Sequence, residues 1–228
     1  MKKNYPKNVT LIEVGPRDGF QLEASTLPTE IKLEIIEKLA AAGLTHIQVT
    51  SFVNPKRIPQ MADAEELVGR LPKVAGVEFS GLVLNHRGVE RAYHSGLKYV
   101  EVSISASDSH SRKNTGMTLE EARKMGVEMI RLAREYNLII RAGIQCALGC
   151  VDEGAIPPPR VLKIARSFLD CGIDALALSD TTGMGHPASV AHLLELLLPV
   201  TDNLPIIMHF HDTRGLGLVN VMTALEHC

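Results

Sequence analysis

Short apolar runs rich in β-branched residues alternate along the chain with segments whose apolar positions recur at helical spacing. Residues 29–42 show the helical spacing, with Ile31, Ile35 and Leu39 on one face and Gly43 just beyond the end. A short apolar run between turn signals is instead typical of a buried strand. Such runs are found at residues 9–14, 46–52, 78–84, 99–105, 139–148, 175–180 and 205–211.

Capping signals mark the helices between these runs. Thr118-Leu119-Glu120-Glu121 has the form of a capping box and predicts a helix that continues to about residue 136. The prolines at positions 157–159 predict a second helix start, and that helix should end before Cys171-Gly172. No linker, low-complexity stretch or block of charge interrupts the pattern, so we expect a single catalytic domain over residues 1–228.

Seven strand–helix units in series predict a parallel sheet with right-handed crossovers. Their spacing of roughly 30 residues suits a TIM-type (β/α)8 barrel, which typically takes ~250 residues. Gly15-Pro-Arg-Asp-Gly19 follows the first run and does not match the G-x-G-x-x-G fingerprint of an open, doubly wound dinucleotide-binding sheet. We therefore favour an α/β barrel whose chain ends after the seventh unit, with the eighth strand absent, over the open sheet.

Composition and charge exclude several classes of protein. The chain is 45% apolar and 22% charged, an ordinary balance for a soluble domain. Its 24 basic and 26 acidic residues give a net charge of −2, which argues against nucleic acid and anionic membranes as partners. No apolar run reaches the ~18 residues of a membrane span, and the start has no secretory signal. Four cysteines are too few for a disulfide scaffold, so we expect a cytoplasmic protein.

Residues at the ends of the predicted strands carry the chemistry, because a barrel builds its active site at that face. His209 and His211 are two positions apart on one strand, so alternation points both imidazoles to the same side. Asp18, at the end of the first strand, would add a carboxylate and complete a three-ligand set for Mg²⁺, Mn²⁺, Zn²⁺ or Fe²⁺. The alternative is that the histidines are polar core residues bonded to the backbone.

Other strand ends give weaker signals. Asp180 ends a strand and would order a ligand histidine or a water, although Asp-Thr before glycine is also a common turn. The segment 105–114 carries Arg112, Lys113 and Asn114, which would meet a phosphate or carboxylate unless this is a solvated loop.

The cysteine pair after the fifth run invites a metal interpretation that we reject. Cys146 and Cys150 form a C-x3-C pair, which is a poor zinc signature without partner ligands nearby. We expect one buried thiol and one thiol in the loop.

Several longer motifs occur in one order along the chain and resemble those of a known family, the 3-hydroxy-3-methylglutaryl-CoA lyases. This family belongs to the metal-dependent TIM-barrel lyases with pyruvate carboxyltransferase domains. The motifs at residues 13–19 and 146–150 are similar to those of the lyases and favour them over the related synthases. The motifs are Glu13-Val-Gly-Pro-Arg-Asp-Gly19, Thr50-Ser-Phe-Val53, Pro59-Gln-Met61, Cys146-Ala-Leu-Gly-Cys150, Asp180-Thr181 and His209-Phe-His-Asp-Thr213.

The resemblance implies metal-dependent cleavage of hydroxymethylglutaryl-CoA, or a close analogue, to acetyl-CoA and acetoacetate. It implies that Asp18, His209 and His211 bind the divalent ion, with Mg²⁺ or Mn²⁺ favoured. His209 would also relay the hydroxyl proton, and Arg17 would stabilise the thioester enolate. The catalytic set implied is Arg17, Asp18, His209, Asp180 and Gln48. Residues expected to bind the acyl-CoA substrate are Gln21, Thr50, Ser51, Asn114 and Arg214. We also expect a homo-oligomer.

Two positions depart from the lyase pattern. Gln48 stands where these lyases usually carry a glutamate, and an amide cannot exchange a proton. We therefore expect Gln48→Glu to increase turnover of hydroxymethylglutaryl-CoA in a form that has the eighth strand. Arg214 stands where a tyrosine is typical, which would change the acyl group selected.

The end of the chain also departs from the family, because an asparagine ligand and a cysteine-bearing loop of the family are not found. Asn220 is not that asparagine, since it is expected in the helix after the seventh strand. We expect this chain to be at least ~100-fold less active than a form extended through an eighth strand and to self-associate through open sheet edges. The alternatives to a lyase are a Claisen condensation synthase joining acetyl-CoA to a 2-oxo acid, and a metal-binding remnant without turnover.

Overall fold

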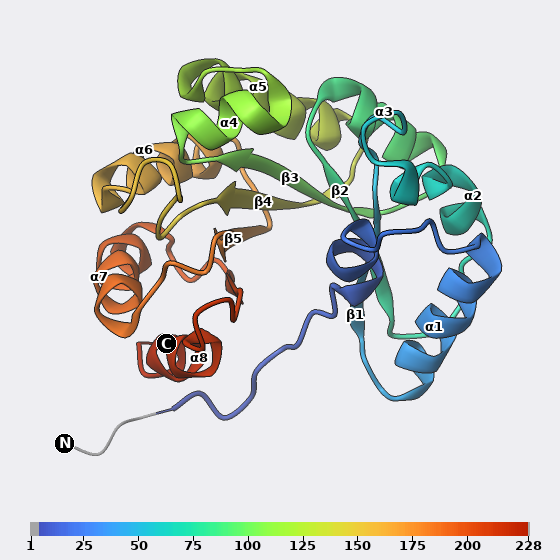
Figure 1. Cartoon of the computed structure of the whole chain (residues 1–228), viewed down its shortest axis with the longest axis horizontal. Coiled ribbons are helices and arrows are strands. Elements are labelled where there is room, and N and C mark those ends of the chain that lie inside the picture. The colour runs from blue at the N-terminus through green and yellow to red at the C-terminus, as the bar shows by residue number, and fades with distance from the viewer. Residues whose placement is uncertain (1–4, 228) are drawn as a thin grey trace. The chain divides into compact units, whose positions relative to one another are not determined.

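The structure, a computed structural model that describes residues 5–227, alternates strands with helices as an α/β protein (Figure 1). The strands are β1 (His46–Ser51), β2 (Glu78–Val83), β3 (Tyr99–Ser105), β4 (Ile139–Gln145), β5 (Ala175–Asp180) and β6 (Ile206–Phe210). The α-helices are α1 (Thr29–Ala41), α2 (Ala64–Gly69), α3 (His86–His94), α4 (Asp108–Thr115), α5 (Leu119–Glu135), α6 (Pro158–Leu169), α7 (Pro187–Leu197) and α8 (Gly217–Leu225). Three shorter helical turns are η1 (Gly15–Gly19), η2 (Pro59–Met61) and η3 (Leu198–Val200).

The six strands found in residues 5–227 form one sheet in the order β1-β2-β3-β4-β5-β6, and the pairings recorded between neighbours are parallel. The predicted first strand at residues 9–14 is wrong. Only Glu13 pairs there, through one isolated parallel bridge to Ile47. Val9 and Leu11 are more than half exposed, so this segment lacks the buried neighbours that would hold a longer strand.

The chain divides into two compact units. The first unit contains residues Val9–Val102 and Leu132–Ile140, and the second contains residues 5–8, Ser103–Arg131 and 141–227. The first unit therefore holds β1 and β2 with the first part of β3, and the second holds β5 and β6 with most of β4. The single-domain expectation stays a prediction.

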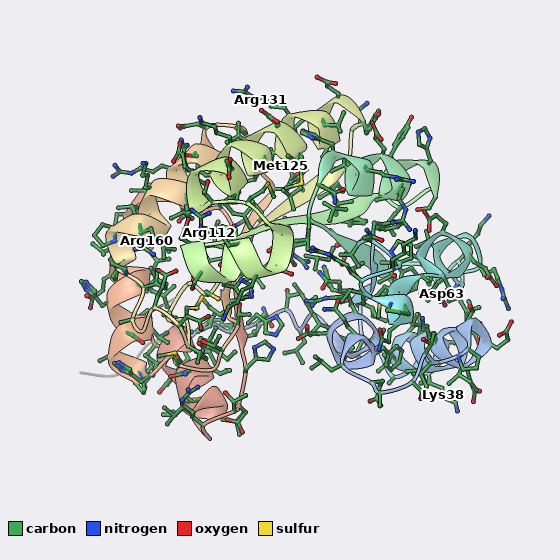
Figure 2. The ribbon with its side chains drawn as sticks, turned by 45° about the horizontal axis from the view of Figure 1, so that its top comes forward. Lys38, Asp63, Arg112, Met125, Arg131 and Arg160 are labelled. Carbon is green, nitrogen blue, oxygen red and sulfur yellow. The ribbon has the colours of Figure 1, made fainter. Side chains whose placement is uncertain are left out.

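In the first unit, α1 and α2 lie beside β1 (Figure 1) and are held by a buried ion pair. The Lys32 ammonium donates to Asp63 Oδ1 at 2.6 Å and to the carbonyl oxygen of Gln60 at 2.6 Å. The Thr29 hydroxyl donates to the other oxygen of Asp63, the residue labelled beside α2 in Figure 2. Removing one partner of such a buried pair typically costs about 3–5 kcal/mol.

In the second unit, helix starts follow the capping signals. The Thr118 hydroxyl accepts from Glu121 N–H, and the Glu121 carboxylate accepts from Thr118 N–H, so the predicted capping box is confirmed. Residues 108–115, for which a solvated loop was one of two interpretations, form α4 instead. Ser107 caps this helix by accepting from His110 N–H, and Gly116 ends it in the left-handed conformation.

Asn220 lies in α8, as predicted, and its amide donates to the carbonyl oxygen of Gly185. None of the helices within residues 5–227 is both long enough and apolar enough to cross a bilayer.

Candidate active site

Arg17 and Asp18 lie on η1, a π-helical turn directly after the bridge at Glu13. Glu13 joins this turn to the sheet, because its N–H donates to His46 O and its carbonyl accepts from Gln48 N–H. Its side-chain oxygen also accepts from Gly15 N–H at 2.6 Å. Short π-helical turns occur often at functional sites because they redirect side chains out of the regular helical spacing. In η1 the guanidinium of Arg17 and the carboxylate of Asp18 therefore lie at adjacent positions.

Arg17 is 8% exposed, and its guanidinium is held by two oxygens. Its Nη1 donates to Asp18 Oδ1 at 2.5 Å and its Nε donates to Gln48 Oε1 at 2.5 Å. The Gln48 side chain continues the network, because its Nε2 donates to Glu101 Oε2 at 3.0 Å. The first unit thus brings three predicted site residues together and adds Glu101, which the sequence analysis missed. The available signal was an acid inside the apolar run at residues 99–105.

A bulge in β1 between Gln48 and Thr50 decides which of the Thr50 and Ser51 hydroxyls lies on the side of Gln48. Gln48 pairs with Ser80 and Thr50 pairs with Gly81, so the register shifts between them. Paired residues of neighbouring strands point to one side of a sheet and successive residues alternate, so Thr50 faces away from Gln48, whereas Ser51 shares its side.

The contacts of the two hydroxyls agree with this assignment. Thr50 Oγ1 donates to Met61 Sδ at 3.7 Å, so that hydroxyl is used in packing against η2. The Ser51 side chain is fully buried, and its hydroxyl has no hydrogen-bond partner among the described residues. Buried polar groups normally have partners, so this hydroxyl is suited to a bound ligand.

In the second unit, the two histidine rings lie next to each other at the end of β6. The centroids of His209 and His211 are 4.8 Å apart. His211 Nδ1 lies 3.1 Å from the main-chain oxygen of Asp180. A carbonyl oxygen only accepts, so Nδ1 carries the proton in this contact and Nε2 has the lone pair. This is the tautomer that metal-binding histidines usually adopt.

Asp180 itself is almost fully buried at the end of β5 and organises the following loop. Its carboxylate accepts from Met184 N–H at 2.9 Å and from Gly185 N–H at 3.0 Å. A Cβ at Gly185 would lie 2.6 Å from Leu148 Cδ1 and 2.9 Å from Asp180 Oδ2, so any other residue there would displace one of these two side chains. Asp180 therefore orients His211 through its backbone, while its side chain fixes the loop.

Two of the three remaining substrate-binding candidates, Arg214 and Asn114, have local partners. Arg214 Nη1 donates to the carbonyl oxygens of Thr182 at 2.7 Å and Gly183 at 3.0 Å, which tethers it to the loop after β5. Asn114 lies on α4, and its side-chain amide nitrogen is 3.5 Å from Gln145 Oε1. Gln21 is half-buried just after η1.

The two basic neighbours of Asn114 on α4 form surface ion pairs. Arg112 pairs with Asp108 of the same helix, and Lys113 pairs with Asp152.

Cys146 is buried directly after β4, and Cys150 lies in the following loop, where it is buried as well. Burial raises the pKa of Cys146 to about 11. Burial also acts to raise the pKa of Cys150, but hydrogen bonds from Ser107, Ser109 and backbone N–H groups outweigh it and lower that pKa.

A carboxylate in the same loop is a second feature that the sequence did not signal. Burial acts to raise the pKa of Glu153, yet its hydrogen bonds hold that pKa at about 2. The donors are the Ser107 and Ser109 hydroxyls, Ser109 N–H, and the guanidinium of Arg160, which is labelled on α6 in Figure 2. These contacts join the loop to the start of α4 and to α6.

Comparison with known proteins assigns the chain to a class. The family model described as HMGL-like matches residues 8–227. The hydroxymethylglutaryl-CoA lyase of Bacillus subtilis is 40% identical over 97% of this chain and 74% of its own length. The chain therefore belongs to the HMGL-like family. The cytoplasmic 3-hydroxy-3-methylglutaryl-CoA lyase of Rattus norvegicus is 38% identical over 97% of this chain.

Solved structures agree. A crystal structure of the Bacillus subtilis HMG-CoA lyase is 39% identical and superposes with a TM-score of 0.94, over 98% of this chain and 75% of that chain. The predicted TIM-barrel type of α/β fold is confirmed by this similarity. An HMG-CoA lyase of Acinetobacter baumannii in complex with coenzyme A and 3-methylmalate is 32% identical with a TM-score of 0.90, over 96% of this chain and 72% of that chain.

The chain spans 64% of the length of the rat relative and 48% of the Arabidopsis thaliana mitochondrial hydroxymethylglutaryl-CoA lyase, to which it is 36% identical. The activity, substrate and partners of the whole protein are therefore proposals.

Proposed function

We propose that this protein is a divalent-metal-dependent carbon–carbon lyase that cleaves hydroxymethylglutaryl-CoA, or a close analogue, to acetyl-CoA and acetoacetate. The observation that carries the proposal is the match to relatives named as hydroxymethylglutaryl-CoA lyases, at 38% and 40% identity over 97% of this chain. These relatives are lyases by name, so a condensation synthase is not favoured.

The residues present fit a divalent cation, by the chemistry of their donor atoms. Asp18 offers a carboxylate oxygen, and His209 and His211 each offer an imidazole nitrogen. Because Nδ1 of His211 donates to the Asp180 carbonyl, Nε2 is the ring nitrogen with a lone pair, which is the donor type that a divalent cation binds. We propose that these three residues hold Mg²⁺ or Mn²⁺. When bound, the ion would orient the substrate oxygens and lower the pKa of the hydroxyl group.

Arg17 is proposed to stabilise the negative charge that develops on the thioester oxygen as the carbon–carbon bond breaks. A guanidinium stays charged and presents several donors in a fixed plane. Two of the Arg17 nitrogens already donate to Asp18 and Gln48, so the orientation of the plane is set before substrate arrives. Preorganised donors of this kind are worth about 10²–10³ in rate.

His209 is proposed to accept the proton of the substrate hydroxyl, because an imidazole changes protonation near neutral pH. Asp180 is a positioning residue in this account, since it acts through the ring of His211 and the loop at Met184. Ser51 is the substrate-binding candidate with the strongest support, because its buried hydroxyl lacks a partner among the described residues. Gln21, Asn114 and Arg214 stay proposed substrate contacts, whereas the Thr50 hydroxyl is used in packing against Met61.

An acyl-CoA substrate is supported by the coenzyme A in the Acinetobacter baumannii structure. A homo-oligomer and a cytoplasmic location stay predictions, and relatives named as cytoplasmic and as mitochondrial are both similar to this chain.

The test is an assay of purified, metal-stripped protein for acetyl-CoA release from hydroxymethylglutaryl-CoA, before and after addition of Mg²⁺ or Mn²⁺. The proposal requires turnover that depends on the added ion and that His211→Ala removes. Metal binding without turnover of any acyl-CoA would instead identify the metal-binding remnant.

A further inference from the structure

We propose that Glu101 on β3 is a positioning residue for the Arg17 guanidinium and acts through the amide of Gln48. The three side chains form a chain of hydrogen bonds within the first unit, from Glu101 Oε2 to Gln48 Nε2 and from Gln48 Oε1 to Arg17 Nε. The assignment of a role to Arg17 rests on the proposed lyase function, whereas the effect of Glu101 on Arg17 does not.

The two neighbours of Gln48 fix the orientation of its amide. A carboxylate only accepts hydrogen bonds and a guanidinium only donates them. Gln48 must therefore turn its NH₂ group toward Glu101 and its oxygen toward Arg17, and the reversed amide would face two mismatched partners. Gln48 is fully buried, so water cannot replace either contact. The position of the Arg17 Nε–H bond thus depends on Glu101, which is connected to Arg17 through the Gln48 amide.

The charges of this cluster explain why a carboxylate is needed beyond Gln48. Arg17 is a buried cation and Glu101, at 9% exposed, is a buried anion. A buried charge without a compensating charge is strongly unfavourable. Asp18 also contacts Arg17, but its side chain is 23% exposed, and in the proposed site its charge is shared with a divalent cation. The carboxylate of Glu101 then compensates the buried positive charge of the Arg17 guanidinium.

The register of the sheet places Glu101 within reach. Gln48 pairs with Ser80, and Ser80 pairs with Tyr99, so the three point to one side of the sheet. Glu101 is two residues beyond Tyr99 and returns to that same side. It pairs with Leu82, which in turn pairs with Ser51. The carboxylate therefore lies on the side of the sheet that carries Gln48 and the buried Ser51 hydroxyl.

This arrangement changes the expectation for Gln48→Glu. With Glu101 in place, a second carboxylate at position 48 would lie about 3 Å from the first, and two buried like charges at that distance cannot both stay ionised. The single substitution should therefore lower turnover. The double variant Gln48→Glu/Glu101→Gln keeps one carboxylate and one amide in exchanged positions, so it should retain the orientation of Arg17.

The experiment compares the parent protein with Glu101→Gln, Gln48→Glu and the double variant. Glu78→Gln is the matched control, since Glu78 is a partly exposed acid at the start of the neighbouring β2. The first measurement is the NMR signal of the Arg17 Nε–H group, assigned by its loss in Arg17→Lys, together with its hydrogen exchange. The second is the separation of kcat and KM for hydroxymethylglutaryl-CoA. Thermal unfolding shows that each variant is folded.

We expect Glu101→Gln to shift the Arg17 Nε–H signal and speed its exchange, and to lower kcat by about 10–100-fold with little change in KM, the range seen for outer-shell residues. The double variant should recover both readouts, and Glu78→Gln should change neither. An unchanged Arg17 signal in Glu101→Gln would overturn the proposal, as would a double variant no better than Glu101→Gln. If the parent has no turnover, the lyase function fails, while the NMR comparison still decides the role of Glu101.

Discussion

His211 Nδ1 lies 3.1 Å from the main-chain oxygen of Asp180, which fixes the ring tautomer at the end of β6. The contact is made by the backbone of Asp180, while its carboxylate accepts from Met184 and Gly185 N–H. Folding of the loop after β5 and the orientation of a proposed metal ligand are therefore coupled through one residue.

Replacing His211 by alanine should weaken Mn²⁺ binding by at least ~10-fold, because one of the three proposed ligands is lost. Calorimetric titration of Mn²⁺ into the parent and the variant measures this effect. His192→Ala is the control, since His192 is an exposed residue of α7. Equal Mn²⁺ affinities of the parent and His211→Ala would rule out this ligand assignment.

Arg17→Lys should lower kcat for hydroxymethylglutaryl-CoA by about 10²–10³-fold, because an ammonium keeps the charge but not the planar set of donors. Steady-state kinetics of the parent and the variant provide the measurement. Arg131→Gln is the control, since Arg131 is an exposed residue of α5, labelled in Figure 2. Parental kcat in the Arg17→Lys variant would show that Arg17 has no role in the rate-limiting chemistry.

Ser51→Ala should stabilise the protein by about 1 kcal/mol and raise KM. A buried hydroxyl without a partner carries a desolvation penalty of that order, which the methyl group removes, while a substrate contact is lost. Thr50→Val is the comparison, because the Thr50 hydroxyl packs against Met61 on the other side of β1 and its loss should leave KM unchanged. Urea unfolding measures the stability of both variants, and steady-state kinetics measure their KM. Destabilisation by Ser51→Ala with unchanged KM would contradict a substrate contact by the Ser51 hydroxyl.

Glu153→Gln should reduce stability at neutral pH by about 1–2 kcal/mol, after allowance for solvent screening of a partly exposed group. The folded-state pKa of Glu153 is about 2, below its ordinary value of 4.5, so its contribution is present above pH 4.5 and is lost as pH falls toward 2. The difference between parent and variant in urea unfolding should therefore shrink over that pH range. Glu135→Gln, at an exposed position of α5, should show no such trend.

Patterns of local apolar residues predicted most of the sheet. The bounds of β3 and β5 agree with the runs at residues 99–105 and 175–180, because buried parallel strands are apolar almost without interruption. Helix α4 was missed, because Asp108–Thr115 is polar throughout and has no apolar period. Its only signals are the caps at Ser107 and Gly116.

Long-range contacts of the site were not predictable in the same way. The contact between Gln48 and Glu101 joins residues 53 positions apart, and it depends on which strands are neighbours. The bulge that puts Ser51, rather than Thr50, on the side of Gln48 leaves no mark in the order of the residues, because it is a property of pairing with β2. In contrast, alternation along a single strand was enough to place His209 beside His211.

Metal-dependent cleavage of hydroxymethylglutaryl-CoA can be followed in a single titration. Acetyl-CoA release is followed with metal-stripped protein as Mn²⁺ is titrated, in parallel for the parent and His211→Ala. We expect no release without the ion, a rise that saturates with Mn²⁺ for the parent, and a strongly reduced rate for the variant. Release that is independent of Mn²⁺, or equal in the two proteins, would contradict this expectation.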